Sequence, residues 1–155
     1  MAVDHELRHN VRRSLFTSVS ELADLEFQRA TWLDPEMQNP HYGYVEFVEC
    51  FYDLAAGSYD ADDPASDKAP LRHWVGSGVL TQAEMDVIWP LHLALRVYRP
   101  QDCYDHNAIL DDPAWQSVSL AASNAKDGLA RIGLSPEELN YFKNELPNAA
   151  AKRWP

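Results

Sequence analysis

The sequence predicts an all-α fold, a single compact bundle of about five to seven helices, and three observations support this. Helix-start signals recur along the chain, as a capping residue followed by proline or by a glutamate three positions later. Apolar residues repeat at helical spacing. No hairpin turn of the Asn-Gly or Asp-Gly type stands between alternating, strand-like segments. With 155 residues, 46% of them hydrophobic, we expect one domain over 1–155 with a sizeable core.

The first helical segment is expected between Asp4, a candidate N-cap, and Asp34. Its apolar stripe consists of Leu7, Val11, Leu15, Val19 and Leu22. Ser18 with Glu21 forms a capping-box pattern inside this run, so the segment is either one long helix or two abutting helices. It should end before Pro35, because the residue before a proline disfavours helical geometry.

The second helix is expected at about 42–56, with Gly57 as its C-terminal stop. One edge of this helix carries Glu46, Glu49 and Asp53, which places three carboxylates on one exposed face. Residues 57–70 follow as an expected acidic loop, which contains Asp60, Asp62, Asp63 and Asp67.

Helix signals continue in the middle of the chain. A short helical turn is expected at 71–75, followed by a helix from Thr81 to about Tyr98, where Thr81 and Glu84 form a capping box. Pro90 lies inside this helix and should kink or split it, because proline lacks the amide hydrogen that continues the helical ladder.

Two more helices are expected near the C-terminus. Asp112 and Pro113 supply an N-cap and a first helical residue for a helix through Arg131. The string that begins at Ser135 repeats the start signal and opens a short helix that stops at Leu146. The tail at 147–155 is expected to be loosely held.

Charge is concentrated in one quarter of the chain. The sequence has 24 acidic and 13 basic residues, a net charge of −11, and residues 32–70 alone contain nine acidic residues and one basic residue. This imbalance disfavours binding to nucleic-acid phosphates. No apolar run approaches the ~20 residues of a membrane span, and the charged N-terminus is unlike a signal peptide. Two cysteines fit a reducing compartment. We therefore expect a cytoplasmic protein that binds neither nucleic acid nor membrane.

The string from His5 to His9 matches the H-E-x-x-H pattern. On a helix, two histidines four residues apart can hold zinc while the glutamate, here Glu6, acts as a general base. A small zinc-dependent hydrolase using His5, Glu6 and His9 is therefore the alternative function. Arg8 places a cation beside these ligands and no third ligand follows at the extended spacing. We accordingly favour an exposed helix start and expect no zinc, no other metal and no cofactor.

Other candidate motifs favour structural roles. Gly76-Ser77-Gly78 lacks the frame of a nucleophile elbow, and Cys50 and Cys103 form no Cys-x-x-Cys pair. His92 lies in an apolar run and is expected in or beside the core, and His106 belongs to a polar cluster that caps neighbouring helices. The aspartates of 57–70 lack the glycine and the final glutamate of a calcium loop. No catalytic residue is assigned, and an enzyme is the less favoured class.

Four segments carry a resemblance to known proteins. They are residues 22–33 (LADLEFQRATWL), 45–54 (VEFVECFYDL), 75–84 (VGSGVLTQAE) and 107–121, with Asp112-Pro113-Ala114-Trp115 at its centre. Together they resemble a group of small, uncharacterised, bacterial all-helical proteins, some of which are similar to immunity proteins encoded beside secreted toxins. The segments are patterns of caps and core residues. The resemblance therefore implies a helical fold and transfers no functional residue.

The favoured function is a non-enzymatic, acidic protein-binding domain, an immunity-type inhibitor of a basic toxin. An acidic face complements the basic surface of a nucleic-acid-cleaving toxin, accelerates the encounter and then covers the active site. The carboxylates expected to bind this basic protein partner are Glu46, Glu49, Asp53, Asp60, Asp62, Asp63 and Asp67. Two alternatives stay open: an ordinary solvated face, and an assembly subunit with no toxin partner.

Overall fold

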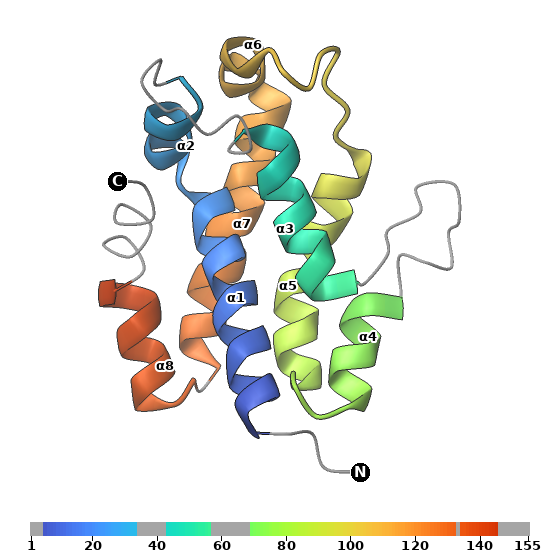
Figure 1. Cartoon of the computed structure of the whole chain (residues 1–155), viewed down its shortest axis with the longest axis vertical. Coiled ribbons are helices and arrows are strands. Elements are labelled where there is room, and N and C mark those ends of the chain that lie inside the picture. The colour runs from blue at the N-terminus through green and yellow to red at the C-terminus, as the bar shows by residue number, and fades with distance from the viewer. Residues whose placement is uncertain (1–4, 34–42, 57–68, 133, 146–155) are drawn as a thin grey trace.

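The computed structural model describes residues 5–33, 43–56, 69–132 and 134–145, and these residues form helices without any strand (Figure 1). The helices are α1 (His5–Ala23), α2 (Leu25–Trp32), α3 (Tyr44–Ala56), α4 (Ala69–Gly76), α5 (Gln82–Val97), α6 (His106–Asp111), α7 (Pro113–Arg131) and α8 (Pro136–Asn140), which continues into a π-helical turn, η1 (Tyr141–Glu145). The all-α prediction is confirmed. The predicted number of helices was too low, because the described residues contain eight α-helices.

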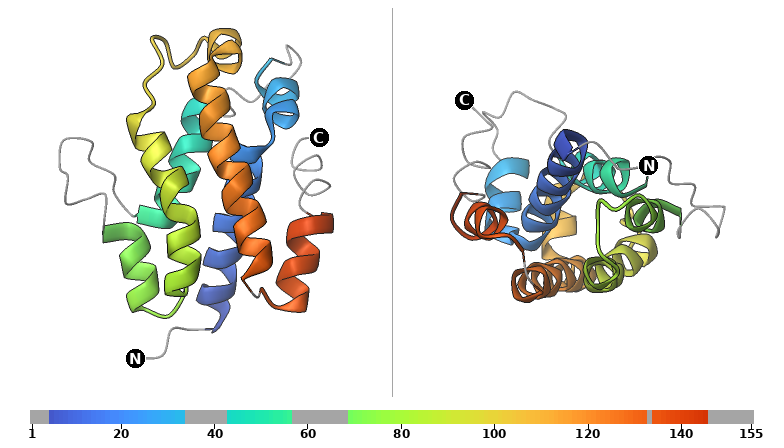
Figure 2. Two further views of the ribbon diagram at one scale, coloured as in Figure 1. Left: turned by 180° about the vertical axis from the view of Figure 1, so that it is seen from behind. Right: turned by 90° about the horizontal axis from the view of Figure 1, so that it is seen from below.

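The four long helices form an antiparallel bundle. In Figure 1, α1 and α5 run upward and α3 and α7 run downward. Helix α1 packs against both α3 and α7, and α7 also packs against α5. The short helices lie at the two ends of the bundle, with α2 and α6 at the top and α4 and α8 at the bottom (Figures 1 and 2). Each pair of consecutive long helices is therefore joined through one short helix.

The interior of the bundle is apolar and aromatic. The largest side chains with less than 2% exposure come from all four long helices and include Phe16, Phe51, Leu91 and Trp115. Burial of each such side chain contributes roughly 1.5–3 kcal/mol before entropy is counted. The stripe predicted for α1 is buried from Val11 onward, whereas Leu7 is 48% exposed. Leu7 differs because the first turns of α1 lie at the lower end of the bundle (Figure 1).

The N-terminal segment is two helices, and the break lies at Asp24. The Asp24 carboxylate accepts a hydrogen bond from the backbone N–H of Phe27 at 2.9 Å, so Asp24 is the N-cap of α2. The capping box predicted from Ser18 and Glu21 is wrong, because both residues are buried within α1. Helical periodicity gave no indication of the break at Asp24.

Buried side chains complete the corner between α1 and α2. The Gln28 amide donates to the backbone carbonyls of Glu21 (3.0 Å) and Leu22 (2.9 Å), and the Ser119 hydroxyl donates to the Leu22 carbonyl at 2.9 Å. Gln28 also accepts a hydrogen bond of 2.9 Å from the indole N–H of Trp115. The last carbonyls of a helix lack partners within it, and buried polar groups need them. These contacts therefore fasten the corner to α7.

Local capping signals located the later helices correctly, with one exception. Thr81 with Glu84 and Ser135 with Glu138 both form complete capping boxes, and Asp112 caps α7. Helix α6 was not predicted, because six residues are too few to show a periodicity. Asp105 caps α6 by accepting a hydrogen bond from the backbone N–H of Ala108 at 3.2 Å.

Two other boundaries differ from the predicted ones. Helix α5 passes through Pro90 as one element, so the predicted alternative of a split helix is wrong. Pro90 is exposed, and the lost backbone hydrogen bond lies on the solvent side of α5. Helix α4 spans Ala69–Gly76, and it includes the last two residues of the predicted loop 57–70. The remainder of that loop and the tail at 147–155 lie outside the described residues.

Candidate functional site

The acidic edge predicted for the second helix belongs to α3. Glu49 is exposed, and Glu46 is half-buried. One carboxylate oxygen of Glu46 accepts a hydrogen bond of 2.9 Å from the backbone N–H of Gly43, so this side chain also stabilises the start of α3. On the other side of α3, Phe47 and Phe51 are buried in the core. Helix α3 therefore presents Glu49 to solvent from a firmly packed element.

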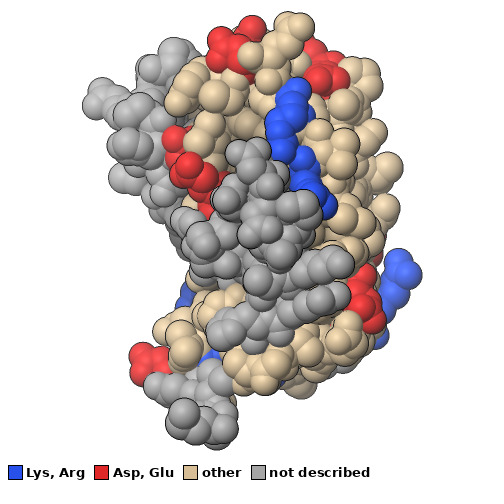
Figure 3. Space-filling model, turned by 90° about the vertical axis from the view of Figure 1, so that its right-hand side faces the viewer, with Lys and Arg blue, Asp and Glu red and all other residues tan. Residues whose placement is uncertain are grey.

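The rest of the predicted partner-binding set has no described side chain. Asp53 lies on α3, and Asp60, Asp62, Asp63 and Asp67 lie outside the described residues. On the face shown in Figure 3, the described acidic side chains form separate groups, with basic side chains between them. On that face, the described residues alone do not make one continuous acidic surface.

The H-E-x-x-H string forms the first turns of α1, as expected for a helix start. His5, Glu6 and His9 are exposed, and the Arg8 side chain donates a hydrogen bond to the Gly78 carbonyl at 3.3 Å. Among the described residues, no group of three histidine, cysteine, aspartate or glutamate side chains is placed to hold a metal ion.

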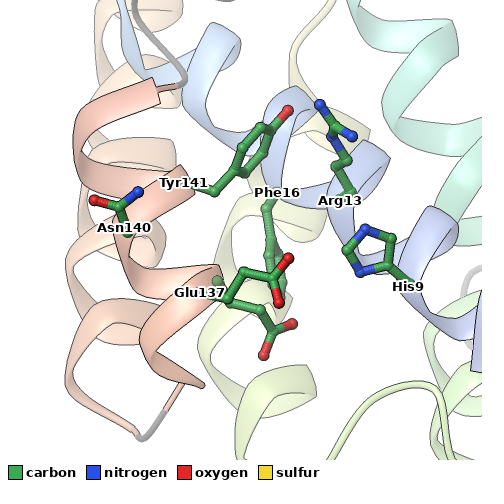
Figure 4. A pocket seen from close by; sticks show the side chains of 7 residues that line it. His9, Arg13, Phe16, Glu137, Asn140 and Tyr141 are labelled. Atoms are coloured by element: carbon green, nitrogen blue, oxygen red, sulfur yellow. The ribbon is translucent and has the colours of Figure 1, made fainter.

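His9 instead lines a groove between α1 and the segment formed by α8 and η1, which we call the α1–α8 groove (Figure 4). His9 and Arg13 stand on the α1 side, and Glu137 stands on the opposite side, with Phe16 behind them. Tyr141 closes the upper end of the groove in this view. The groove has a volume of about 160 Å³.

Aromatic contacts hold the groove in shape. Phe16 packs edge-on against Phe142 of η1, with ring centroids 5.6 Å apart. The Arg13 guanidinium lies over the Tyr141 ring, 4.8 Å from its centroid, and the Tyr141 hydroxyl is 3.1 Å from the Thr17 hydroxyl. A cation over an aromatic face at this distance is attracted by the electrons of the ring. The α8–η1 segment is therefore attached to α1 along the whole groove.

Beneath the groove, Arg12 joins three helices. Its guanidinium makes two hydrogen bonds of 2.7 Å to the two carboxylate oxygens of Glu84 at the start of α5. It also donates to the Val79 carbonyl at 3.0 Å and to the carboxylate of Glu138 in α8. Arg12 is only 4% exposed. Such a paired, charge-assisted geometry is what allows ionised groups to be buried.

The pKa values of this cluster reflect its strong pairing. Burial by itself would lower the pKa of Arg12, but the hydrogen bonds and charges of Glu84 and Glu138 outweigh it and raise that pKa. Partial burial would likewise raise the pKa of Glu138, yet the hydrogen bond and charge of Arg12 hold it below its usual range. Arg12 and Glu138 therefore both remain ionised near neutral pH.

Sequence reasoning found the two glutamates of this cluster but not their partner. Glu84 and Glu138 were identified as members of capping boxes, since both contacts lie within three residues. Arg12 appeared on the sequence only as a charged position beside the apolar stripe of α1. The Arg12–Glu138 contact spans 126 positions, and no local signal could have revealed it.

The other residues considered as functional candidates in the sequence are two histidines and two cysteines. His92 is 2% exposed and its ring packs on that of Trp89, with centroids 5.0 Å apart, which confirms the expected core histidine. His106 is half-buried in the first turn of α6, and its ring centroid lies 5.4 Å from that of Trp32. Cys50 on α3 is exposed, and Cys103 is half-buried.

An aromatic cluster fills the upper end of the bundle. Tyr44, Tyr98 and Trp115 contact one another with ring centroids 5.3–5.9 Å apart, and Trp32 adjoins Trp115. Burial, together with the charge of Asp112, raises the pKa of Tyr98 to about 12. The Tyr98 hydroxyl donates to the Asp112 carboxylate at 3.4 Å. This cluster packs α3, α5 and α7 together, and its rings are buried.

Comparison with known proteins gave no match among family models, curated proteins or solved structures. In the described part of the chain, no helix has the length and apolar character needed to cross a bilayer.

Proposed function

We propose that this protein is a non-enzymatic, acidic protein-binding domain, and that it acts as an immunity-type inhibitor of a basic toxin. The observation that carries this proposal is the concentration of charge: nine acidic residues and one basic residue in positions 32–70, around a helix that presents Glu49 to solvent. The contact surface consists of the exposed edge of α3 together with the acidic segment that follows it.

The packing of α3 supports this use of the helix. Phe47 and Phe51 anchor one side of α3 in the core, with 3% and 0% exposure. The charged edge is thereby presented by a helix whose position is set before the partner arrives. A preorganised surface loses less conformational freedom on binding than a flexible one.

The expected mechanism is electrostatic steering followed by occlusion. A basic protein that approaches an acidic surface is oriented before contact, and the association rate rises by about 10–10³-fold at low salt. Nucleic-acid-cleaving toxins carry basic surfaces, since their substrate is a polyanion. A domain that covers such a surface blocks access of the substrate and needs no chemistry of its own.

The test begins with the natural partner, co-purified from the native cell, identified by mass spectrometry and then expressed separately. Its association rate is measured by stopped flow against the wild type and against the double variant Glu49→Lys/Asp53→Lys. A matched control, Asp86→Lys/Asp127→Lys, changes the net charge equally but places it at exposed positions of α5 and α7.

The α3 variant should associate at least about tenfold more slowly than wild type at low salt, and the difference should shrink as salt screens the charges. The control should change the rate far less. Equal effects of the two variants would show that only net charge matters. A natural partner that is not basic, or an unchanged rate at both salt concentrations, would refute the proposal.

A further inference from the structure

We propose that the outer face of α5 and α7 is the contact surface of a homodimer, in which a second copy of this chain packs against it about a two-fold axis. Seen from behind, the two helices lie side by side, and from below they lie on the side of the bundle opposite α1 and α3 (Figure 2). The face is therefore separate from the acidic edge of α3. We call it the α5–α7 face and define it by its exposed residues Pro90, Leu93, Val97, Ser117, Leu120 and Asn124.

The spacing of these residues gives each helix one outward row. Positions 90, 93 and 97 of α5 and positions 117, 120 and 124 of α7 follow the three- and four-residue steps that keep side chains on one side of a helix. Leu91 and Leu95 of α5 and Val118 and Ala122 of α7 are buried in the core. The two rows therefore point away from the core.

One close approach sets the register between the two rows. A Cβ at Gly128 would lie 2.7 Å from a methyl carbon of Val87, so these two positions of α7 and α5 face each other. Leu120 precedes Gly128 by just over two helical turns. Because the helices are antiparallel, Leu120 lies between the heights of Leu93 and Val97 along the bundle. The large apolar side chains of the two rows are therefore neighbours.

Exposed apolar side chains concentrate on this face. The described part of the chain exposes six large hydrophobic side chains, and three of them are Leu93, Val97 and Leu120, which are 42%, 78% and 61% exposed. Ala94 and Ala121 are half-buried and, by their helical positions, lie between the two rows. Their short side chains allow another helix to approach closely. A contiguous apolar surface of this kind indicates an interaction site.

The distribution of charge favours a second copy as the occupant. The net charge of −11 makes two copies repel each other in most orientations, but none of the six residues of the α5–α7 face is charged. Asp86 and Asp127 lie at the lower end of the two rows. A two-fold axis that runs across the helices places these aspartates of the two copies at opposite ends of the contact. No acidic side chain then meets its own equivalent.

The size of the face predicts a weak dimer. Helix α5 has 16 residues, which corresponds to about 24 Å, and two adjacent helices of ~10 Å diameter present roughly 480 Å² in projection. The accessible area of such an uneven surface exceeds its projection. Specific interfaces bury about 600 Å² or more on each partner, so the α5–α7 face is at the lower end of this range. We expect a dissociation constant of about 10–100 µM.

Sedimentation equilibrium of the full-length protein tests this inference, with a thiol reductant present because Cys50 is exposed. The average mass should be that of one chain at about 1 µM and should approach that of two chains at about 500 µM. It should not exceed two chains, because a two-fold contact closes on itself. Raising the salt concentration to about 0.5 M should leave the dimer equally stable or more stable, since salt screens charge repulsion and not apolar contacts.

Two variants connect the dimer to the α5–α7 face. Leu120→Glu and Val97→Glu each place two carboxylates in the contact, one from each copy, and should raise the dissociation constant at least about tenfold. Leu7→Glu is the matched control, because it makes the same change at an exposed leucine of α1. It should alter the dissociation constant by less than about twofold. Circular dichroism should show the helical spectrum of the wild type for all three variants.

Three results would overturn the inference. A chain that remains monomeric up to about 500 µM would show that a second copy does not cover this face. A dimer that neither Leu120→Glu nor Val97→Glu weakens would place the contact elsewhere on the molecule. Equal weakening by Leu120→Glu and Leu7→Glu would mean that only the net charge of the chain matters.

Discussion

Replacing Arg12 with methionine should lower the free energy of unfolding by about 3–5 kcal/mol, the cost of removing one partner of a buried ion pair. Methionine retains much of the length of the arginine side chain, so the change mainly removes charge and hydrogen bonds. It leaves the Glu84 carboxylate, 6% exposed, without its counter-ion and removes the donor from the Val79 carbonyl. Since small domains are stable by about 5–15 kcal/mol, the loss is a large share of the total.

A second substitution separates the charge from the packing. In the double variant Arg12→Met/Glu84→Gln, the glutamine amide retains an oxygen for the backbone N–H of Thr81, which Glu84 contacts at 2.9 Å. The buried Glu84 carboxylate is then gone, and only the Glu138 carboxylate, 21% exposed, still lacks its counter-ion. The double variant should therefore be more stable than Arg12→Met alone by about 1–3 kcal/mol. Arg29→Met is the matched control. It removes an arginine that is 50% exposed and 3.5 Å from Asp111, and it should cost about 0–1 kcal/mol.

Urea denaturation followed by circular dichroism measures these differences. With a slope of about 2 kcal/mol per molar, the midpoint of Arg12→Met should fall by roughly 1.5–2.5 M, whereas that of Arg29→Met should fall by less than about 0.5 M. Equal losses for the two single variants would refute the reasoning. A double variant less stable than Arg12→Met would refute it as well, because the buried charge would then not be the source of the cost.

Two further perturbations test the packing of α8 and α5. The folded-state pKa of Glu138 lies below its usual value, so the ionised carboxylate stabilises the fold at neutral pH. This stability is lost as the pH falls through about 4.5 and then through the folded-state pKa. The urea midpoint of the wild type should therefore fall over this pH range, and that of Glu138→Gln should fall less steeply. A Cβ at Gly128 would lie 2.7 Å from a methyl carbon of Val87, so Gly128→Ala should destabilise the protein by about 1–3 kcal/mol. A Cβ at Gly76 would have no atom within 4 Å, so Gly76→Ala should be neutral or slightly stabilising in the same assay.

The sequence by itself determined the fold class and most helix starts, because these depend on contacts between near neighbours. Thr81 bonds to Glu84 and Ser135 to Glu138 across three residues, and such pairs are visible in any sequence. Periodicity also predicted an acidic edge on α3, of which the structure describes Glu49 as exposed and Glu46 as half-buried. The sequence pointed to Ser18 as an internal cap and missed Asp24, the actual N-cap of α2, because only the tertiary structure shows that Ser18 is buried within α1.

The tertiary structure alone decided what these helices build together. Arg12 and Glu138 meet across 126 positions, and the α1–α8 groove brings His9 and Arg13 opposite Glu137. Capping signals mark where a helix begins and ends, but they do not determine which helices pack against each other. That choice is made by the packing of apolar surfaces, which carries no directional signal in the sequence. For this reason the groove and the buried ion cluster became visible only once α1 and α8 lay side by side.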